Sequence, residues 1–210
     1  MHPLRSARLP AVFALTALAL VSLAYIGAAW ADLQDAALMD RYVADPDSVS
    51  MAQFDASDVT DYGVAMTLFG TFVMAALLFV NWLYRVRDNA EVLSPDEHRH
   101  GRRWLTWGWA VPVVNLWFPK RIVDDIWNAS GDRSQQHRSG LVRAWWAAWL
   151  LSNLSGIAVS AVFPEVSALT YRLDAVIDGV VVVAAGLAAV VVWKITGFQE
   201  ARRTSLARVQ

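Results

Sequence analysis

The sequence predicts an all-α integral membrane protein with four transmembrane helices and a short re-entrant or interfacial hairpin on the cytoplasmic side. Hydrophobic residues make up 56% of the 210 positions, whereas a soluble domain has about 45–50%. Four apolar runs have about 20 residues each, the length that crosses a bilayer as a helix. Segments rich and poor in basic residues also alternate along the chain, which is the pattern that orients membrane helices.

The first apolar run covers residues 10–31 and lies between Arg8 and Asp32. Its basic flank and the small-residue pattern that ends at Ala31 also fit a secretory signal peptide cleaved after Ala31. The apolar core of such a signal usually has about 7–15 residues, so the longer run favours an uncleaved anchor. We therefore expect residues 1–31 to contain the N-terminus and the first transmembrane helix.

Residues 32–61 carry eight Asp against one basic residue, Arg41. Their spacing does not match a Ca²⁺-binding loop, so we expect a solvated, partly helical acidic loop outside the cytoplasm. The second transmembrane helix is predicted at residues 62–84. It begins a membrane domain that we expect to extend over residues 62–196.

Residues 104–118, WLTWGWAVPVVNLWF, are apolar enough to enter a membrane but too few to cross it. As a helix they would rise roughly 22 Å, against a hydrocarbon core of about 30 Å. Pro112 lies in the middle of the segment, where it breaks or kinks a helix. The next residues, 120–129, place apolar side chains on one face, as in an interfacial helix. Residues 104–129 are therefore expected to form the re-entrant or interfacial hairpin.

The third and fourth transmembrane helices are predicted at residues 142–163 and 175–195, followed by a cytoplasmic tail at 197–210. With both termini inside, sixteen of the eighteen Lys and Arg residues lie in the cytoplasm. A fifth crossing at 104–118 would turn several basic residues outward, so four crossings are favoured. We expect a multi-pass protein of the plasma membrane.

Tryptophan is concentrated on one side of this topology, because ten of the eleven Trp residues are cytoplasmic and only Trp30 is outer. The Trp ring is apolar and its N–H needs a partner, so an ordinary aromatic belt forms at both interfaces. One-sided enrichment predicts an aromatic layer around the hairpin, with an ordinary belt plus core packing as the alternative. The candidate ligand- or partner-binding residues in and near this layer are Asn81, Arg85, Asn89, Trp109, Pro112, Asn115, Trp117, Asp125, Trp127, Trp145 and Trp146.

Polar side chains at this depth need partners. Asn115 could bond the carbonyl groups that Pro112 frees, or it could contact a ligand. His98 and His100 lie in the basic stretch HRHGRR. Without a third ligand nearby they predict a solvated linker rather than a metal site.

Charged residues around the hairpin are expected to pair with one another. Arg85 and Arg87 are predicted to bind Asp124 or Asp125, with a lipid phosphate as the alternative. Asp124, Asp125 and Arg85 could also serve phosphate chemistry, but no nucleophile–base pair accompanies them. The chain has no Cys, which excludes disulfides, thiolate metal sites and Cys nucleophiles. The sequence predicts no catalytic residue, no metal and no cofactor.

Several motifs follow one another in a fixed order: NWLYRVRDNAE at 81–91, GWAVPVVNLWFP at 108–119, DIWNAS at 125–130 and the pair Trp145-Trp146. This series resembles the bacterial, mainly actinobacterial, membrane-protein family called domain of unknown function 4328. The resemblance covers residues 62–195, and the preceding helix and acidic loop match only in kind. It implies a multi-pass membrane protein, and it brings no activity, cofactor or catalytic residue.

Three functions are compatible with these patterns. The favoured one is a non-enzymatic binding or regulatory protein that holds a lipid, an apolar ligand or a partner helix at the Trp-rich cytoplasmic side. The second is a small transporter or channel subunit, because broken apolar segments can line a cavity. The third is a membrane enzyme. Membrane lipids are the expected partners, with a homo-oligomer or a partner membrane protein as further candidates, and the net charge of −1 gives no reason to expect nucleic acid.

Overall fold

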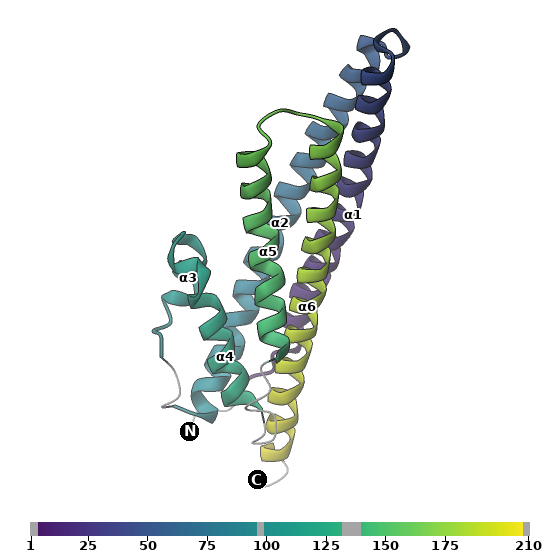
Figure 1. The fold of residues 1–210 in the computed structure, drawn as a ribbon. Coiled ribbons are helices and arrows are strands. Elements are labelled where there is room, and N and C mark those ends of the chain that lie inside the picture. The colour runs from purple at the N-terminus through teal and green to yellow at the C-terminus, as the bar shows by residue number, and fades with distance from the viewer. Residues whose placement is uncertain (1–3, 96–98, 132–139, 208–210) are drawn as a thin grey trace. The chain divides into compact units, whose positions relative to one another are not determined.

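The computed structural model describes residues 4–95, 99–131 and 140–207, and every regular element in these ranges is a helix (Figure 1). The elements are α1 (Arg8–Ala44), η1 (Pro46–Ser48), α2 (Met51–Leu93), α3 (Trp104–Ala110), η2 (Val114–Leu116), α4 (Phe118–Ser130), α5 (Gly140–Val162) and α6 (Ala168–Ala207). By length and composition α1, α2, α5 and α6 are able to span a membrane. The predicted all-helical fold with four such helices is confirmed.

The predicted acidic loop at residues 32–61 is helical except for a short turn. Helix α1 continues to Ala44 and α2 begins at Met51. In the turn, the Asp45 side chain accepts a hydrogen bond from the backbone N–H of Asp47 at 3.2 Å. The helix continues past residue 32 because good helix formers, mainly Ala and Leu, separate the Asp residues there. The segment is therefore more helical than the partly helical loop that the sequence predicts.

Three of the long helices exceed the length that a membrane requires. Helices α1, α2 and α6 have 37, 43 and 40 residues. At 1.5 Å per residue each rises at least about 55 Å, against a hydrocarbon core of about 30 Å. The charged ends of these helices can therefore lie outside an apolar layer that their middle parts cross.

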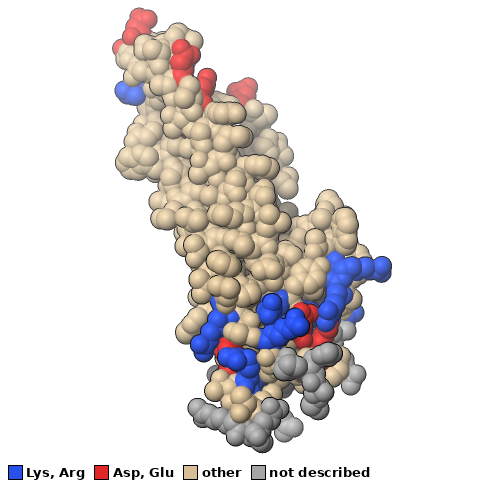
Figure 2. All heavy atoms as spheres, turned by 180° about the vertical axis from the view of Figure 1, so that it is seen from behind, with Lys and Arg blue, Asp and Glu red and all other residues tan. Residues whose placement is uncertain are grey.

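The chain forms two compact units. Unit 1 comprises residues 1–18, 74–146 and 186–210, and unit 2 comprises residues 19–73 and 147–185. Unit 1 therefore contains α3, η2 and α4 complete, together with the start of α1 and α5 and the end of α2 and α6. Within unit 1, blue Lys and Arg side chains gather on the surface with a few red acidic ones (Figure 2).

Unit 2 has small residues inside and large apolar residues outside. The buried positions of α1 and α6 in this unit include Ala28, Ala31, Ala184 and Ala185. The exposed positions include Leu23, Ile26, Phe69, Phe72 and Ile157. Helices that pack in a membrane use small residues at their contacts, since large apolar side chains lose nothing by facing lipid.

The acidic residues of unit 2 have local partners. The Ser57 hydroxyl donates a hydrogen bond to the carboxylate of Asp35. Arg172 of α6 forms an ion pair with Asp40 of α1. These contacts join α1 to α2 and to α6 within this unit.

Unit 1 has a conventional apolar core. Helix α4 begins at Phe118 with Pro119 in its first turn, a position where the missing N–H of proline costs nothing. Its buried face is mostly apolar at helical spacing, as the sequence predicts, and it also includes the polar residues Asp125 and Ser130. The largest fully buried apolar side chains of unit 1 are Trp82, Leu83, Val86, Leu105, Ile122, Val123, Ile126, Val142, Val191, Val192 and Ile195.

A chain of buried amides joins four parts of unit 1. The Asn89 Nδ2 group donates to Gln199 Oε1 at 2.9 Å and to the backbone oxygen of Arg5 at 2.8 Å. Gln199 Nε2 donates to the backbone oxygen of Val86 at 2.8 Å and to Ser130 Oγ at 2.9 Å. The N-terminal residues, α2, α4 and α6 are thereby tied to one point. We call Asn89, Gln199 and Ser130 the amide network.

Replacing Gln199 with Leu should destabilise unit 1, because the side chains of Asn89 and Ser130 each lose a buried partner. An unpaired buried polar group costs about 1–3 kcal/mol. Thermal unfolding in mild detergent should show a lower midpoint than wild type. The control Ser205→Ala changes an exposed residue of the same helix and should leave the midpoint unchanged. A Gln199→Leu midpoint at or above that of wild type would show that the network adds no stability.

Candidate binding site

Four aromatic rings from three helices meet in unit 1. The ring of Phe79 in α2 lies 5.7 Å from that of Trp109 in α3 and 6.1 Å from that of Trp145 in α5. Trp109 also lies 6.4 Å from Trp145 and 6.2 Å from Trp146. These centroid distances fall in the range of about 4.5–7 Å at which aromatic pairs attract. We call Phe79, Trp109, Trp145 and Trp146 the aromatic cluster.

Indole hydrogen bonds fix the surroundings of this cluster. Trp146 Nε1 donates to the backbone oxygen of Leu116 at 3.1 Å, which attaches η2 to α5. Trp82 packs on Phe79 at 5.2 Å, and its Nε1 donates to Thr196 Oγ1 of α6 at 3.0 Å. Trp82 and Trp146 thus obtain the polar partner that their N–H groups need.

The segment between α3 and α4 is irregular, as Pro112 predicts. Helix α3 ends at Ala110, and the Asn115 backbone N–H closes a turn onto the oxygen of Val111 at 2.8 Å. Proline has no N–H and cannot continue the helical ladder. A Cβ added at Gly108 would lie 3.5 Å from the Cβ of Phe118, so α3 and α4 pack closely here.

Asn115 has a buried side-chain oxygen without a hydrogen-bond partner among the described residues. Its neighbour in sequence is Leu116, whose carbonyl holds Trp146. The sequence left two roles for Asn115, bonding the carbonyls around Pro112 or contacting a ligand. The backbone N–H of Asn115 bonds Val111, but no bond from its side chain to those carbonyls occurs among the described residues, and the orphaned oxygen keeps the second role open. Buried unpaired acceptors are uncommon, because they lose their bonds to water.

Large apolar side chains are exposed around this turn. They belong to Trp107, Val113, Leu116 and Trp117. Exposed apolar patches mark contact with a membrane, a ligand or a partner. Trp117 and Pro112, both predicted site residues, therefore lie at the surface of the α3–α4 pair rather than inside it.

The remaining predicted site residues fall into other groups. Trp127 packs on Phe198 of α6 at 5.2 Å, and Asn89 belongs to the amide network. Asn81 is exposed and Arg85 is half-buried. Within the described ranges, neither side chain forms a hydrogen bond or an ion pair. The structure thus joins Trp109, Trp145 and Trp146 in the aromatic cluster and leaves these four residues outside it.

Arginines of α2 and of the loop after it converge on one glutamate. Arg87 is buried, and its Nε lies 2.8 Å from Glu91 Oε1 while its Nη2 donates to the backbone oxygen of His100 at 2.8 Å. Arg102 binds Glu91 with its Nη2 and also lies 3.1 Å from Asp88. The connection that precedes α3 is therefore attached to the end of α2.

The predicted pairing of Arg87 with Asp124 or Asp125 was wrong. The spacing of four residues on α2 brings Glu91 beside Arg87, so the arginine has a nearer partner on its own helix. Asp124 instead binds Lys120 on α4. Asp125 is buried, lies 3.3 Å from Arg99 Nε and accepts the Arg99 backbone N–H at 3.2 Å.

His100 is not the solvated residue that the sequence predicts, and His98 lies outside the described residues. The His100 ring packs on Phe118 at 4.4 Å, and its Nδ1 atom is buried. Burial lowers the pKa of His100, and the charge of Asp125 opposes this effect only in part. The side chain is therefore neutral at physiological pH.

Replacing His100 with Leu should weaken the pH dependence of stability. Because the folded pKa lies below the ordinary value of about 6.5, the unfolded chain takes up the proton first as pH falls. The stability that depends on neutral His100 is present above about pH 6.5 and is lost as pH falls through the folded pKa. Unfolding midpoints between about pH 8 and about pH 5 should fall more for wild type than for His100→Leu. Equal losses would contradict this role.

The sequence did not identify several residues that complete the site. Phe79 could have been found, because it shares a helical face with Trp82, Leu83 and Val86. No local sequence pattern marked Thr196 or Gln199 as part of the site. In the part of the chain that the structure describes, no group of three metal-ligating side chains occurs. The aromatic cluster and Asn115 can bind a ligand through apolar contact, aromatic stacking and hydrogen bonding.

The fold and the site define a class, namely all-helical proteins with four helices able to span a membrane and an aromatic cluster beside a broken helix pair. Residues 45–197 match the family described as Domain of unknown function (DUF4328). The protein belongs to this family, and the resemblance in the motifs is confirmed. No match was found among curated proteins or among solved structures.

Proposed function

We propose that the protein is a multi-pass plasma-membrane protein that binds a lipid, an apolar ligand or a partner helix at the aromatic cluster, without catalysis. The observation that carries the binding proposal is the buried, unpaired side-chain oxygen of Asn115. It lies one residue from Leu116, whose carbonyl accepts the hydrogen bond of Trp146. An apolar surface with one unpaired acceptor suits a molecule that is mostly apolar and carries one donor.

Membrane insertion is supported by which side chains are buried. Just before α1 and along its first turns, the buried residues are Ala7, Ala11, Ala14 and Ala17, and the exposed ones include Leu9, Val12 and Phe13. A helix in water would bury the large apolar residues instead. The excess of Lys and Arg in the segments assigned to the cytoplasm supports an orientation with both termini inside. In this orientation α3 and α4 form an interfacial or re-entrant pair.

A transporter or channel subunit is the second candidate. It is favoured by the irregular backbone around Pro112, since such backbone at membrane depth is tolerated where it is buried or lines a cavity. Reconstituted protein should then show solute flux that Asn115→Ala abolishes. Absence of flux across a broad panel of solutes would contradict the transport role and leave the binding role as the proposal.

The proposed topology predicts opposite labelling of two single cysteines in a chain that has none. Ala52 near the start of α2 and Ser205 near the end of α6 are both exposed. In intact cells a membrane-impermeant maleimide should label Ala52→Cys and should reach Ser205→Cys only after lysis. Labelling of Ser205→Cys from outside would reverse the orientation, and labelling of neither after lysis would mark a failed reagent control.

The binding role predicts a ligand that depends on Asn115. Mass spectrometry of protein purified in mild detergent should detect a defined molecule with wild type, and Asn115→Ala should lose it because the acceptor is gone. The matched control is Asn153→Ala. Asn153 is exposed and bonds only the Trp149 oxygen of its own helix, at 2.7 Å.

Thermal unfolding of the same preparations separates lost binding from lost folding. Asn115→Ala should keep a midpoint close to that of wild type, because its side-chain oxygen has no partner to lose. If wild type and both variants carry the same mixed lipids, the α3–α4 pair has only a structural role and the binding proposal fails.

A further inference from the structure

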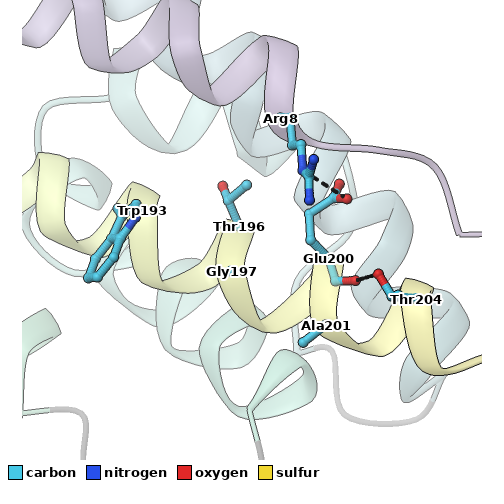
Figure 3. Close-up of a pocket in the computed structure, with 7 residues that line it drawn as sticks. All are labelled: Arg8, Trp193, Thr196, Gly197, Glu200, Ala201 and Thr204. Atoms are coloured by element: carbon cyan, nitrogen blue, oxygen red, sulfur yellow. Dashed lines mark hydrogen bonds and ion pairs between the residues drawn. The ribbon is translucent and has the colours of Figure 1, made fainter.

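A surface groove separate from the aromatic cluster lies in unit 1, between the start of α1 and the last turns of α6. It has a volume of about 390 Å³. Figure 3 shows Arg8 of α1 facing Glu200 across it, with Trp193 further along α6. The lining residues are Arg8, Trp193, Thr196, Gly197, Glu200, Ala201 and Thr204.

The floor of the groove is made by small residues on one face of α6. Trp193, Gly197 and Ala201 follow one another at intervals of four residues and so lie above one another on the helix. A Cβ added at Gly197 would meet no atom within 4 Å. The groove is therefore open because residues 197 and 201 are small, and a larger side chain at 197 would fill it without a backbone clash.

The negative charge of Glu200 is already satisfied by donors around the groove. Its Oε1 accepts the Ser6 hydroxyl at 2.8 Å and the Ala7 backbone N–H at 2.9 Å. Its Oε2 lies 3.0 Å from Arg203 Nε and 3.4 Å from Arg8 Nε. The Glu200 side chain is only 8% exposed. It therefore orients the two arginines and is not placed to receive a cation from solution.

Cationic side chains outnumber acidic ones around the groove. Arg8 lines it, Arg203 also pairs with Glu200, and Lys194 lies 5.0 Å over the ring of Trp193. The Arg8 side chain is 72% exposed although its Nε faces Glu200. Its outer guanidinium nitrogens can thus form the paired hydrogen bonds that guanidinium groups make to phosphate oxygens.

Trp193 gives the groove an apolar end. The ring is 62% exposed, and the predicted fourth transmembrane segment ends two residues later. Exposed Trp at this depth is characteristic of the boundary between hydrocarbon and headgroups. In the proposed topology the rest of the groove, from Gly197 to Thr204, lies at and beyond the headgroup level of the cytoplasmic leaflet.

We infer that this groove binds the phosphodiester headgroup of an anionic phospholipid, with Arg8 contacting the phosphate and Trp193 packing against the glycerol region. The inference rests on the proposed membrane insertion and adds a second, chemically different site. Charge complementarity favours this occupant, because a lipid with net negative charge matches the excess of cationic side chains. Thr196 and Thr204 line the groove, but their hydroxyls already bond Trp82 and the Glu200 carbonyl.

Two variants test the groove. Gly197→Leu fills it, and Arg8→Gln removes the charge that faces the phosphate. Native mass spectrometry in mild detergent, with phosphatidylglycerol titrated in, should show binding weakened at least about tenfold by Arg8→Gln, the effect of losing one hydrogen bond to a charged group. Gly197→Leu should weaken binding at least as much, because its side chain occupies the space of the headgroup. The matched control is Gly186→Leu on the same helix, where an added Cβ also meets no atom within 4 Å; it should bind like wild type.

Three outcomes would overturn the inference. Equal binding of phosphatidylglycerol and phosphatidylcholine by wild type would remove the charge preference. Displacement of the bound lipid by soluble glycerol phosphate would identify a free phosphate compound as the ligand. Unchanged lipid binding in Gly197→Leu and Arg8→Gln would exclude the groove. If the two cysteine labels report the expected topology in that case, membrane insertion stands and only the groove proposal fails.

Discussion

The hydrogen bond from Asn89 to Gln199 is the interaction on which the arrangement of unit 1 depends. It connects residues 110 positions apart in the sequence, and further bonds to Arg5 and Ser130 extend the network to the N-terminal residues and α4. A buried amide left unpaired is costly, so the network is stable only when all four parts are in place. The apolar residues around it supply the driving force for packing, and the amides specify which helices meet.

This fixed arrangement brings the aromatic cluster together. Phe79 stands on the same helix as Asn89, and Trp82 between them bonds Thr196 of α6, so the α2 face that meets Trp109 and Trp145 cannot rotate. The segment around Pro112 is then held from one side by Trp146. The backbone at Asn115 is irregular because of proline, and it is ordered because of a tryptophan. A binding site with this construction has an apolar wall that is rigid and a rim that is exposed.

The two proposed sites differ in chemistry because the charged side chains near them are paired in different ways. At the end of α2, carboxylates and arginines pair with one another, and Asp125 and Arg87 are buried in such pairs. Beside α6, one buried glutamate pairs with two arginines, and the Arg8 side chain stays mostly exposed. The first arrangement closes a surface and the second leaves a cationic one. We therefore propose an apolar ligand for the aromatic cluster and an anionic headgroup for the groove.

The sequence by itself determined the four long apolar helices, the break at Pro112 and the amphipathic character of α4, because composition, length and helical periodicity act locally. The motif order was also sufficient to recognise the family, and tryptophan enrichment pointed to Trp109, Trp145 and Trp146. Only the tertiary structure decided the partners. Gln199, Thr196 and Glu200 meet residues more than 100 positions away, and nothing in their neighbourhood signals such contacts. The pairing of Arg87, the partial burial of His100 and the groove beside Gly197 likewise depend on which helix faces lie together, which local periodicity does not specify.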